Sequence, residues 1–522
     1  MLLNLLAQKG IQYNLEHMQS HLKPNPKLVY SATLPFIFLI VYLLLPTSNS
    51  SLDAYGYADY VNEGKNLFLS HHLLYNALGF FWVKFLNIFG SFDTLATLKV
   101  MNAILASASL LVLGRIFLIL GYNWKKACVW ICFLGSSWGV MRFATENETY
   151  IAPILFSLLA SLYLLKHLKS KKGYQILLSG FFAAFACLVH QIHFFWWFAF
   201  LLALAKEKNI KTVMLYALPA VIVPLAYILA LVYYYQIPLS IEAMAQFVLR
   251  DFESGSATVS VGTKSILFVG ISFVRTFFQA HGYFVNLLRI HPWLYIVIGI
   301  TLTSIGLAIS QIKKIVFTKI TELQTFAFAH ILAFALHLFF AFLSHGNAEF
   351  MVMLPFLMAI SLSIMLSKEG TALILVSLGM FAWNLFLGLV PLKSYAIDGY
   401  SMVAKNIYKE MDSNDKAVFV LFNKPAVENQ VKYYTGQNPD SMYVDIRKIS
   451  KAKIQQEIEL ALNSEKRVYT DCLFRPNTLS RESLTTSADG SVFYPFATSK
   501  IDSASTLSGK YYLVEISKTL SD

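Results

Sequence analysis

Residues 95–121 read LATLKVMNAILASASLLVLGRIFLILG, and this stretch decides the class of protein. Only Lys99 and Arg115 interrupt its apolar and small residues with charge. A helix needs about 20 mostly apolar residues to cross the hydrocarbon core of a membrane. Ten further stretches have a similar character: 28–46, 127–143, 149–166, 174–190, 193–205, 212–235, 293–311, 324–344, 350–366 and 371–391. The sequence therefore predicts an α-helical polytopic membrane protein with about 11 spans.

The composition of the whole chain agrees with a membrane protein. Of its 522 residues, 56% are apolar and 14% are charged, whereas soluble domains average about 45–50% and about 25%. These values exclude a disordered or collagen-like chain and argue against a soluble enzyme with one large core. The 4 cysteines do not have the spacing of a disulfide framework or a zinc site.

Basic residues indicate which ends of the spans face the cytoplasm. Lysines gather in alternate loops, and these loops account for the whole net charge of +12. The clusters are Lys9/Lys23/Lys27, Lys125/Lys126, Lys166/Lys169/Lys171/Lys172, Lys206/Lys208/Lys211, Lys313/Lys314/Lys319 and Lys368. Because loops rich in Lys and Arg stay in the cytoplasm, we expect residues 1–27 to be cytoplasmic and uncleaved, and the chain after the last span to be external. The charge therefore indicates topology and not a nucleic-acid partner.

The stretch 264–290 does not fit this pattern as a full span. It is apolar but contains Arg275 and Gln279, and a full crossing would move Lys313 and Lys314 to the external side. Polar groups at membrane depth are tolerated where they line a cavity. We therefore predict a re-entrant or interfacial segment here.

The last part of the chain, 395–522, differs in composition from the membrane part, 28–394. Four short apolar stretches predict strands, at 417–422, 441–446, 467–472 and 511–516. Two stretches between them, 425–435 and 451–465, have helical spacing. We expect a small α/β domain on the external face.

The external loop 47–94 holds the densest group of polar candidates for chemistry. These are Asp53, Asp59, Glu63, His71 and His72. The stretch 73–89 that follows them is amphipathic and aromatic, which is typical of a helix in the membrane interface. Carboxylates and histidines beside such a helix suit chemistry at the membrane surface. They also suit a solvated loop that carries charges for solubility.

Four other external stretches carry groups of polar residues. They are Arg142, Glu146 and Glu148; His190 and His193; Arg250 and Arg275; and His345 and Glu349. Two carboxylates in one turn can face a cation, paired histidines can bind a metal, a phosphate or a sugar, and arginine can hold a phosphate through two hydrogen bonds. The structural alternatives are, in the same order, a polar turn between helices, interfacial histidines, local ion pairs and a helix cap.

The order of several short strings resembles the GT-C superfamily of membrane glycosyltransferases. That superfamily includes protein mannosyltransferases and the aminoarabinose transferase of lipid A. The strings are SLDAYGYADY (51–60), SHHLLYN (70–76), RFATENETY (142–150) and HGNAEFMVMLP (345–355). The resemblance extends over roughly 28–391, and the end of the chain matches only in its position.

The resemblance implies a catalytic site on the external side and a sugar donor linked to a polyprenyl phosphate. Asp53 has the position of the family's catalytic carboxylate in the first loop. The Asp-Glu doublet that is common in the family is absent, because Ala54 follows Asp53, so Asp59 and Glu63 remain candidates for the same role. The histidines, arginines and remaining glutamates listed above would bind substrate. The location implied is the bacterial inner membrane.

The chemistry that follows is glycosyl transfer to an acceptor hydroxyl on a lipid, a glycan or a protein. A carboxylate can take the proton of this hydroxyl, and the leaving phosphate needs positive charge from arginine, lysine or a divalent cation. The sequence implies no certain cofactor. A transporter or flippase is the alternative function. Inverted repeats with broken helices would favour it, and the sequence shows no such symmetry.

Overall fold

The structure is a computed structural model of the chain. It describes residues 26–250, 262–311, 323–366, 370–412, 417–439, 442–476 and 490–519. Most of the predicted cytoplasmic segment 1–27, and the lysines at 313, 314, 319 and 368, lie outside the described residues.

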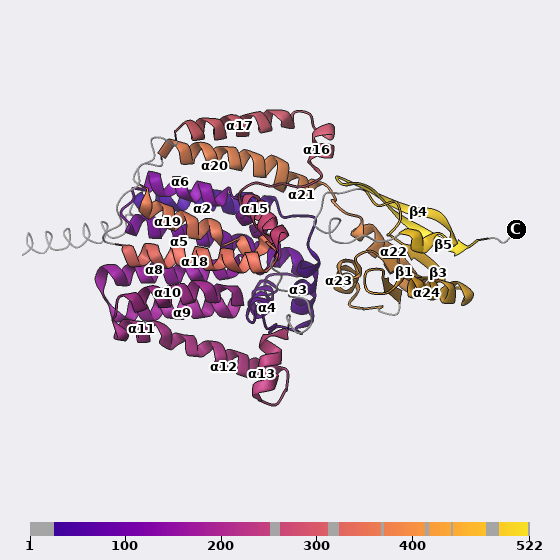
Figure 1. Ribbon diagram of the computed structural model, residues 1–522, viewed down its shortest axis with the longest axis horizontal. Helices are drawn as coiled ribbons and strands as arrows, with labels where there is room; N and C mark the ends of the chain where they lie inside the picture. Colours follow the sequence, from indigo (N-terminus) through magenta and orange to yellow (C-terminus); the bar gives the residue numbers. More distant parts are fainter. Residues whose placement is uncertain are drawn as a thin grey trace, which may run out of the picture.

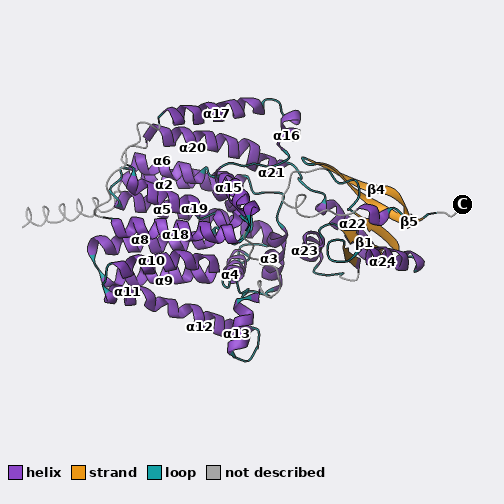
Figure 2. Ribbon diagram, viewed as in Figure 1, coloured by secondary structure: helices purple, strands orange, loops and turns teal. Residues whose placement is uncertain are grey.

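Long apolar helices run side by side and form a bundle, and the strands lie together at one end of it (Figures 1 and 2). Fully buried aromatic side chains such as Trp130, Trp196 and Phe356 fill its interior. Apolar side chains such as Leu229 and Ile300 are exposed on its outside, as expected for a surface that faces lipid. The helices of the bundle are α2 (Pro26–Leu44), α5 (Thr94–Ile119), α6 (Trp124–Gly135), α7 (Trp138–Ala144), α8 (Ala152–Ser170), α9 (Gly173–Val189), α10 (Phe194–Lys206), α11 (Ile210–Ala217), α12 (Ile222–Leu229), α17 (Leu294–Ser310), α18 (Gln324–Leu343), α19 (Leu354–Met365) and α20 (Gly370–Asn384).

Every predicted span coincides with one helix or with several consecutive helical segments, but the predicted count of about 11 is not confirmed. In the described part of the chain, 6 helices are long and apolar enough to cross a membrane. The count becomes 7 if α6 and α7, which meet at an angle of 69°, form one broken span. Four other apolar helices have only 10–17 residues within the described part: Ala32–Leu44, Gly173–Val189, Gln191–Lys206 and Leu294–Ser310. The chain is an integral membrane protein.

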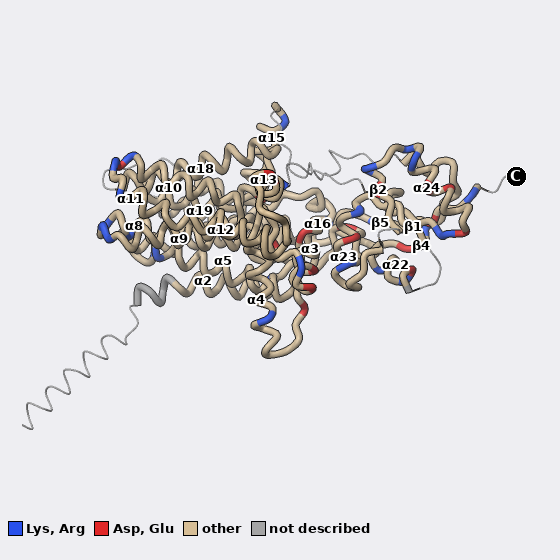
Figure 3. Tube along the Cα trace, turned by 90° about the horizontal axis from the view of Figure 1, so that it is seen from below, with Lys and Arg blue, Asp and Glu red and all other residues tan. Residues whose placement is uncertain are grey.

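The charges of the bundle gather at its two ends. Lysines lie at the end formed by α8, α10 and α11, and the sheet lies beyond the opposite end (Figure 3). The loop 47–94, predicted to be external, forms two helices at that opposite end, α3 (Leu52–Glu63) and α4 (Tyr75–Leu86) (Figure 1). Polar loops therefore meet where the bundle faces the sheet.

The stretch 264–290 forms two short helices, α15 (Thr263–Phe277) and α16 (Phe284–Ile290). The chain leaves α15 at Phe278 in an extended conformation, with φ −124° and ψ 131°. No continuous helix of membrane-spanning length is present in this stretch. That the segment does not cross the membrane fully stays a prediction.

The C-terminal part forms a five-stranded sheet in the order β2-β1-β3-β5-β4. β1 (Ala417–Leu421) lies parallel to β2 (Tyr443–Asp445) and β3 (Arg467–Thr470), and β5 (Gly509–Lys518) is antiparallel to β3 and β4 (Phe496–Thr506). Apolar side chains of α22 (Tyr400–Asp412) and α23 (Lys424–Thr435) pack on one face, and those of α24 (Lys451–Asn463) pack on the other. We call residues 400–519 the α/β unit.

Candidate functional site

The turn between α7 and α8 is buried against the external loop. Its residues Thr145, Glu146, Asn147 and Glu148 are at most 3% exposed. The Asn147 side-chain amide donates to the carbonyl of Ala54 at 2.7 Å, and so joins the turn to α3. This turn is therefore part of the interior at the end of the bundle that faces the sheet.

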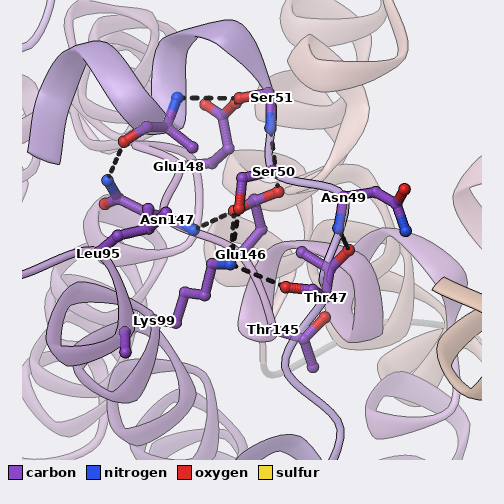
Figure 4. A network of polar contacts seen from close by, with 12 residues as sticks. Thr47, Asn49, Ser50, Ser51, Leu95, Lys99, Thr145, Glu146, Asn147 and Glu148 are labelled. Carbon is purple, nitrogen blue, oxygen red and sulfur yellow. Dashed lines mark hydrogen bonds and ion pairs between the residues drawn. The ribbon is translucent and has the colours of Figure 1, made fainter. Parts of the chain in front are cut away.

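Glu146 lies in a network of ion pairs and hydrogen bonds (Figure 4). Its carboxylate is fully buried, 3.8 Å from Lys99 Nζ and 3.3 Å from Arg142 Nη1. Because two cations surround it, Glu146 acts as a structural counter-charge and is poorly placed to act as a base.

Glu148 has a different environment, although it is only two residues away. The Ser51 hydroxyl donates to its Oε1 at 2.5 Å, and the same Ser51 caps α3 by accepting the amide of Ala54 at 3.0 Å (Figure 4). Burial, followed by the fields of Glu349 and Asp53, raises the pKa of Glu148 well above its usual range. The protonated form of Glu148 is therefore favoured more than in an ordinary glutamate, and a protonated carboxyl group can donate a hydrogen bond.

Asp53 and Glu349 complete a group of three carboxyl groups. Asp53 is an exposed residue in the first turn of α3, directly after the Ser51 cap and Leu52. Glu349 accepts a hydrogen bond from the Tyr150 hydroxyl at 3.1 Å. Burial raises the pKa of Tyr57, and the fields of Asp53, Glu148 and Glu349 raise it further, so all three carboxyl groups act on this one phenol.

Three histidines lie next to these carboxyl groups. The ring centroids of His71 and His72 are 4.1 Å apart, and His190 is 6.3 Å from His72. The Tyr150 ring lies 5.2 Å from His190 and connects the histidines to Glu349. His72 is fully buried, and neither of its ring nitrogens has a hydrogen-bond partner among the described residues. Burial, with smaller effects of His71 and His190, lowers the pKa of His72, so its ring is neutral at pH 7.

Comparisons with known proteins give structural likenesses and no match in sequence. No family model matches the chain, and no curated protein does. The chain is similar to the oligosaccharyltransferase of Archaeoglobus fulgidus solved in complex with Zn and sulfate, at 12% identity and a TM-score of 0.39, over 85% of this chain and 68% of the other. It is also similar to ArnT from Cupriavidus metallidurans bound to undecaprenyl phosphate, at 11% identity and a TM-score of 0.38, over 93% and 97%.

Two of the three carboxylates predicted as catalytic lie apart from this group. Asp59 forms an ion pair with Lys432 of the α/β unit, with Oδ2 and Nζ 2.7 Å apart. Glu63 ends α3 and pairs with Lys65 at 3.4 Å. Of the acidic residues predicted as catalytic in the external loop, only Asp53 lies close to Glu148.

The arginines and the remaining histidines predicted to bind substrate also lie in different places: two arginines lie near one histidine, and the other three residues lie elsewhere. The pKa of His281 is lowered to about 4, mainly because the ring is buried. The positive charges of Arg275 and Arg142 lower it further. His193 lies within the bundle, where its Nδ1 is 2.7 Å from the Ser157 hydroxyl. Arg250 is exposed, and His345 occupies a tight turn with a φ of 55°. Arg142 and Arg275 thus place positive charge near the same imidazole, and His193 is joined to the site through His190, whose carbonyl accepts its backbone amide at 3.1 Å.

A metal site is not formed by the described side chains as they stand. Among the described residues, no group of three or more His, Cys, Asp or Glu side chains lies close enough to hold a metal ion.

Several residues of the site did not stand out in the sequence. Asn102 donates to the carbonyls of Glu146 and Glu148 at 2.8 and 2.7 Å, and Tyr75 donates to Asn147 at 2.9 Å. A polar Asn inside the apolar stretch 95–121 was the available signal, because an amide in a membrane helix needs partners.

Proposed function

We propose that the protein is a GT-C-type membrane glycosyltransferase. It transfers a sugar from a polyprenyl-phosphate donor to a hydroxyl of a lipid, glycan or protein acceptor, on the side of the membrane opposite the lysine clusters. The observation that carries this proposal is the group of Asp53, Glu148 and Glu349 at the end of the apolar bundle that faces the sheet. A lipid-linked donor fits this place, because its chain can remain in the bilayer while its headgroup reaches the carboxyl groups.

In the proposed reaction, the acceptor oxygen attacks the anomeric carbon of the sugar. A bond forms between this oxygen and the carbon, and the bond from the carbon to the phosphate oxygen breaks. The polyprenyl phosphate leaves with the electron pair, and Asp53 accepts the proton of the acceptor hydroxyl. Asp53 is assigned this role because it is the exposed member of the group, whereas Glu148 is buried and its raised pKa disfavours the carboxylate form that a base needs.

The surroundings supply two further requirements of the reaction. Arg142 and Arg275 supply positive charge for the leaving phosphate, which a guanidinium holds well. The neutral ring of His72 offers one donor and one acceptor, and this pair matches a sugar hydroxyl better than a phosphate. We therefore assign the histidine side of the site to the sugar and the arginine side to the phosphate.

The variant Asp53→Asn tests the assignment. It keeps the size of the side chain and removes the base, so turnover with a polyprenyl-phosphate sugar should fall by about 10²–10⁴-fold. Glu63→Gln is the matched control on the same helix and should keep near-normal turnover. Asp53 also follows a helix cap, so the unfolding temperature of both variants is measured alongside turnover.

Near-normal turnover in Asp53→Asn would remove this residue from the mechanism. A larger loss in Asp59→Asn or Glu63→Gln would transfer the role to that residue.

A further inference from the structure

Helix α23 of the α/β unit packs against α3 of the external loop, and polar contacts join residues 429–432 of α23 to α3. Gln430 donates to the Tyr55 hydroxyl at 3.1 Å, and Lys432 pairs with Asp59 at 2.7 Å. Figure 1 shows α23 as the part of the unit that faces α3. The α/β unit is therefore in direct contact with the helix that carries Asp53.

One of these contacts lies beside the proposed catalytic carboxylate. The Asn429 side-chain amide donates to the carbonyl oxygen of Leu52 at 2.9 Å. Leu52 stands between Ser51, which bonds Glu148, and Asp53. Asn429 thus holds the peptide unit from which the Asp53 backbone continues.

A glycine in α3, Gly56, leaves space for the Asn429 side chain to reach Leu52. Gly56 lies one turn after Leu52, and a Cβ atom built there would be 3.1 Å from Asn429 Nδ2. A side chain at position 56 would therefore press on the amide that reaches Leu52. The absence of a side chain at this position is a second feature that favours a close approach of α23.

We propose that Asn429 is a positioning residue for Asp53, so that the α/β unit completes the catalytic site. This inference rests on the proposed function for the role of Asp53. Catalytic groups must be held within a fraction of an ångström, and a shift of about 1 Å can cost about 10²-fold in rate. A cap held from one side by Glu148 and from the other by Asn429 fixes the first turn of α3 in this way.

The variant Asn429→Leu keeps the approximate shape of the side chain and removes its donor. We expect kcat to fall by about tenfold, the equivalent of one hydrogen bond, while KM for the lipid donor stays within about twofold. Glu428→Gln is the matched control on the same helix. Its carboxylate accepts from Asn438 at 2.8 Å within the α/β unit and should affect neither value. An unchanged kcat in Asn429→Leu, or an equal loss in both variants, would overturn the inference.

Amide hydrogen exchange of the whole protein gives a readout that does not depend on activity. In Asn429→Leu, the amides of 54–57 should exchange about tenfold faster, because the first turn of α3 opens more readily, while those of α22 keep their rate. Unchanged exchange at 54–57 would show that Asn429 does not hold this turn. If exchange rises but the wild-type protein transfers no sugar from any polyprenyl phosphate, the proposed function is wrong and the hold of α23 on α3 stands.

Discussion

Glu146 and Glu148 show how two carboxyl groups in one turn acquire different roles. Glu146 faces two cations, so its removal leaves Lys99 and Arg142 with excess charge inside the protein. We expect Glu146→Gln to lower the free energy of unfolding by about 3–5 kcal/mol, the usual cost of breaking a buried ion pair from one side. Thermal unfolding in detergent measures this. Glu63→Gln, at an exposed ion pair, should change stability by at most about 0.5 kcal/mol. Equal effects of the two variants would contradict the buried network.

Glu148 should make the stability of the protein depend on pH. Its folded pKa is raised by burial and by Glu349 and Asp53, so above the unfolded pKa of Glu the folded state binds more protons than the unfolded state. Stability therefore falls as the pH rises from the unfolded pKa of Glu, about 4.3, toward the folded value. Glu148→Gln cannot lose this proton. Compared with the wild type, it should gain unfolding temperature between pH 5 and 8, and the gain should shrink on acidification. A gain that grows on acidification would refute the raised pKa.

At the scale of elements, Asn384 satisfies the ends of two broken helices at once. Its amide nitrogen donates to the carbonyls of Ser136, where α6 ends, and of Phe277, where α15 ends, at 2.7 and 2.6 Å. Its carbonyl oxygen accepts the amide of Gln279 at 2.8 Å. Asn384→Leu should cost about 2–5 kcal/mol, because three buried backbone groups lose their partner where no water replaces it. Thermal unfolding measures the loss, and Ser377→Ala, which removes only a local bond to Leu373, is the control on α20.

Elements with a regular apolar pattern could be predicted from the sequence, and the contacts between them could not. The strands 417–422 and 467–472 were found because apolar residues there face the sheet core on both sides. β4 was missed because it is an edge strand with mostly polar, exposed side chains, FATSKIDSAST, and so lacks that pattern. Asp53 was selected by its place after the first span, and its role as the base stays a prediction. The different roles of Glu146 and Glu148 depend on the ion pair between Glu146 and Lys99. Lys99 lies 47 residues before Glu146, so no local sequence pattern shows this ion pair.

For the whole molecule, the lysine clusters and the α/β unit lie at opposite ends of the bundle (Figure 3). We predict that the unit is external. Cys472 is only 9% exposed and would report poorly, whereas Tyr494 is 83% exposed. A membrane-impermeant maleimide applied to intact spheroplasts should label Tyr494→Cys and leave Lys172→Cys, at the lysine end, unlabelled until the membrane is permeabilised. Labelling in the reverse order would invert the topology and place the carboxyl groups in the cytoplasm.

The chain returns to its own beginning directly after the last helix of the bundle. The Asn49 side chain donates to the carbonyl of Leu392 at 2.7 Å and accepts the amide of Ile397 at 2.9 Å. Asn49 and Leu392 are 343 residues apart, so at about 5–20 residues per second a ribosome needs roughly 20–70 s to deliver the second partner after the first. During that interval the start of the loop 47–94 lacks the backbone partners of Asn49. A chain that stops short of residue 392 never forms these two contacts, so Asn49 keeps two hydrogen-bonding groups that the complete fold pairs.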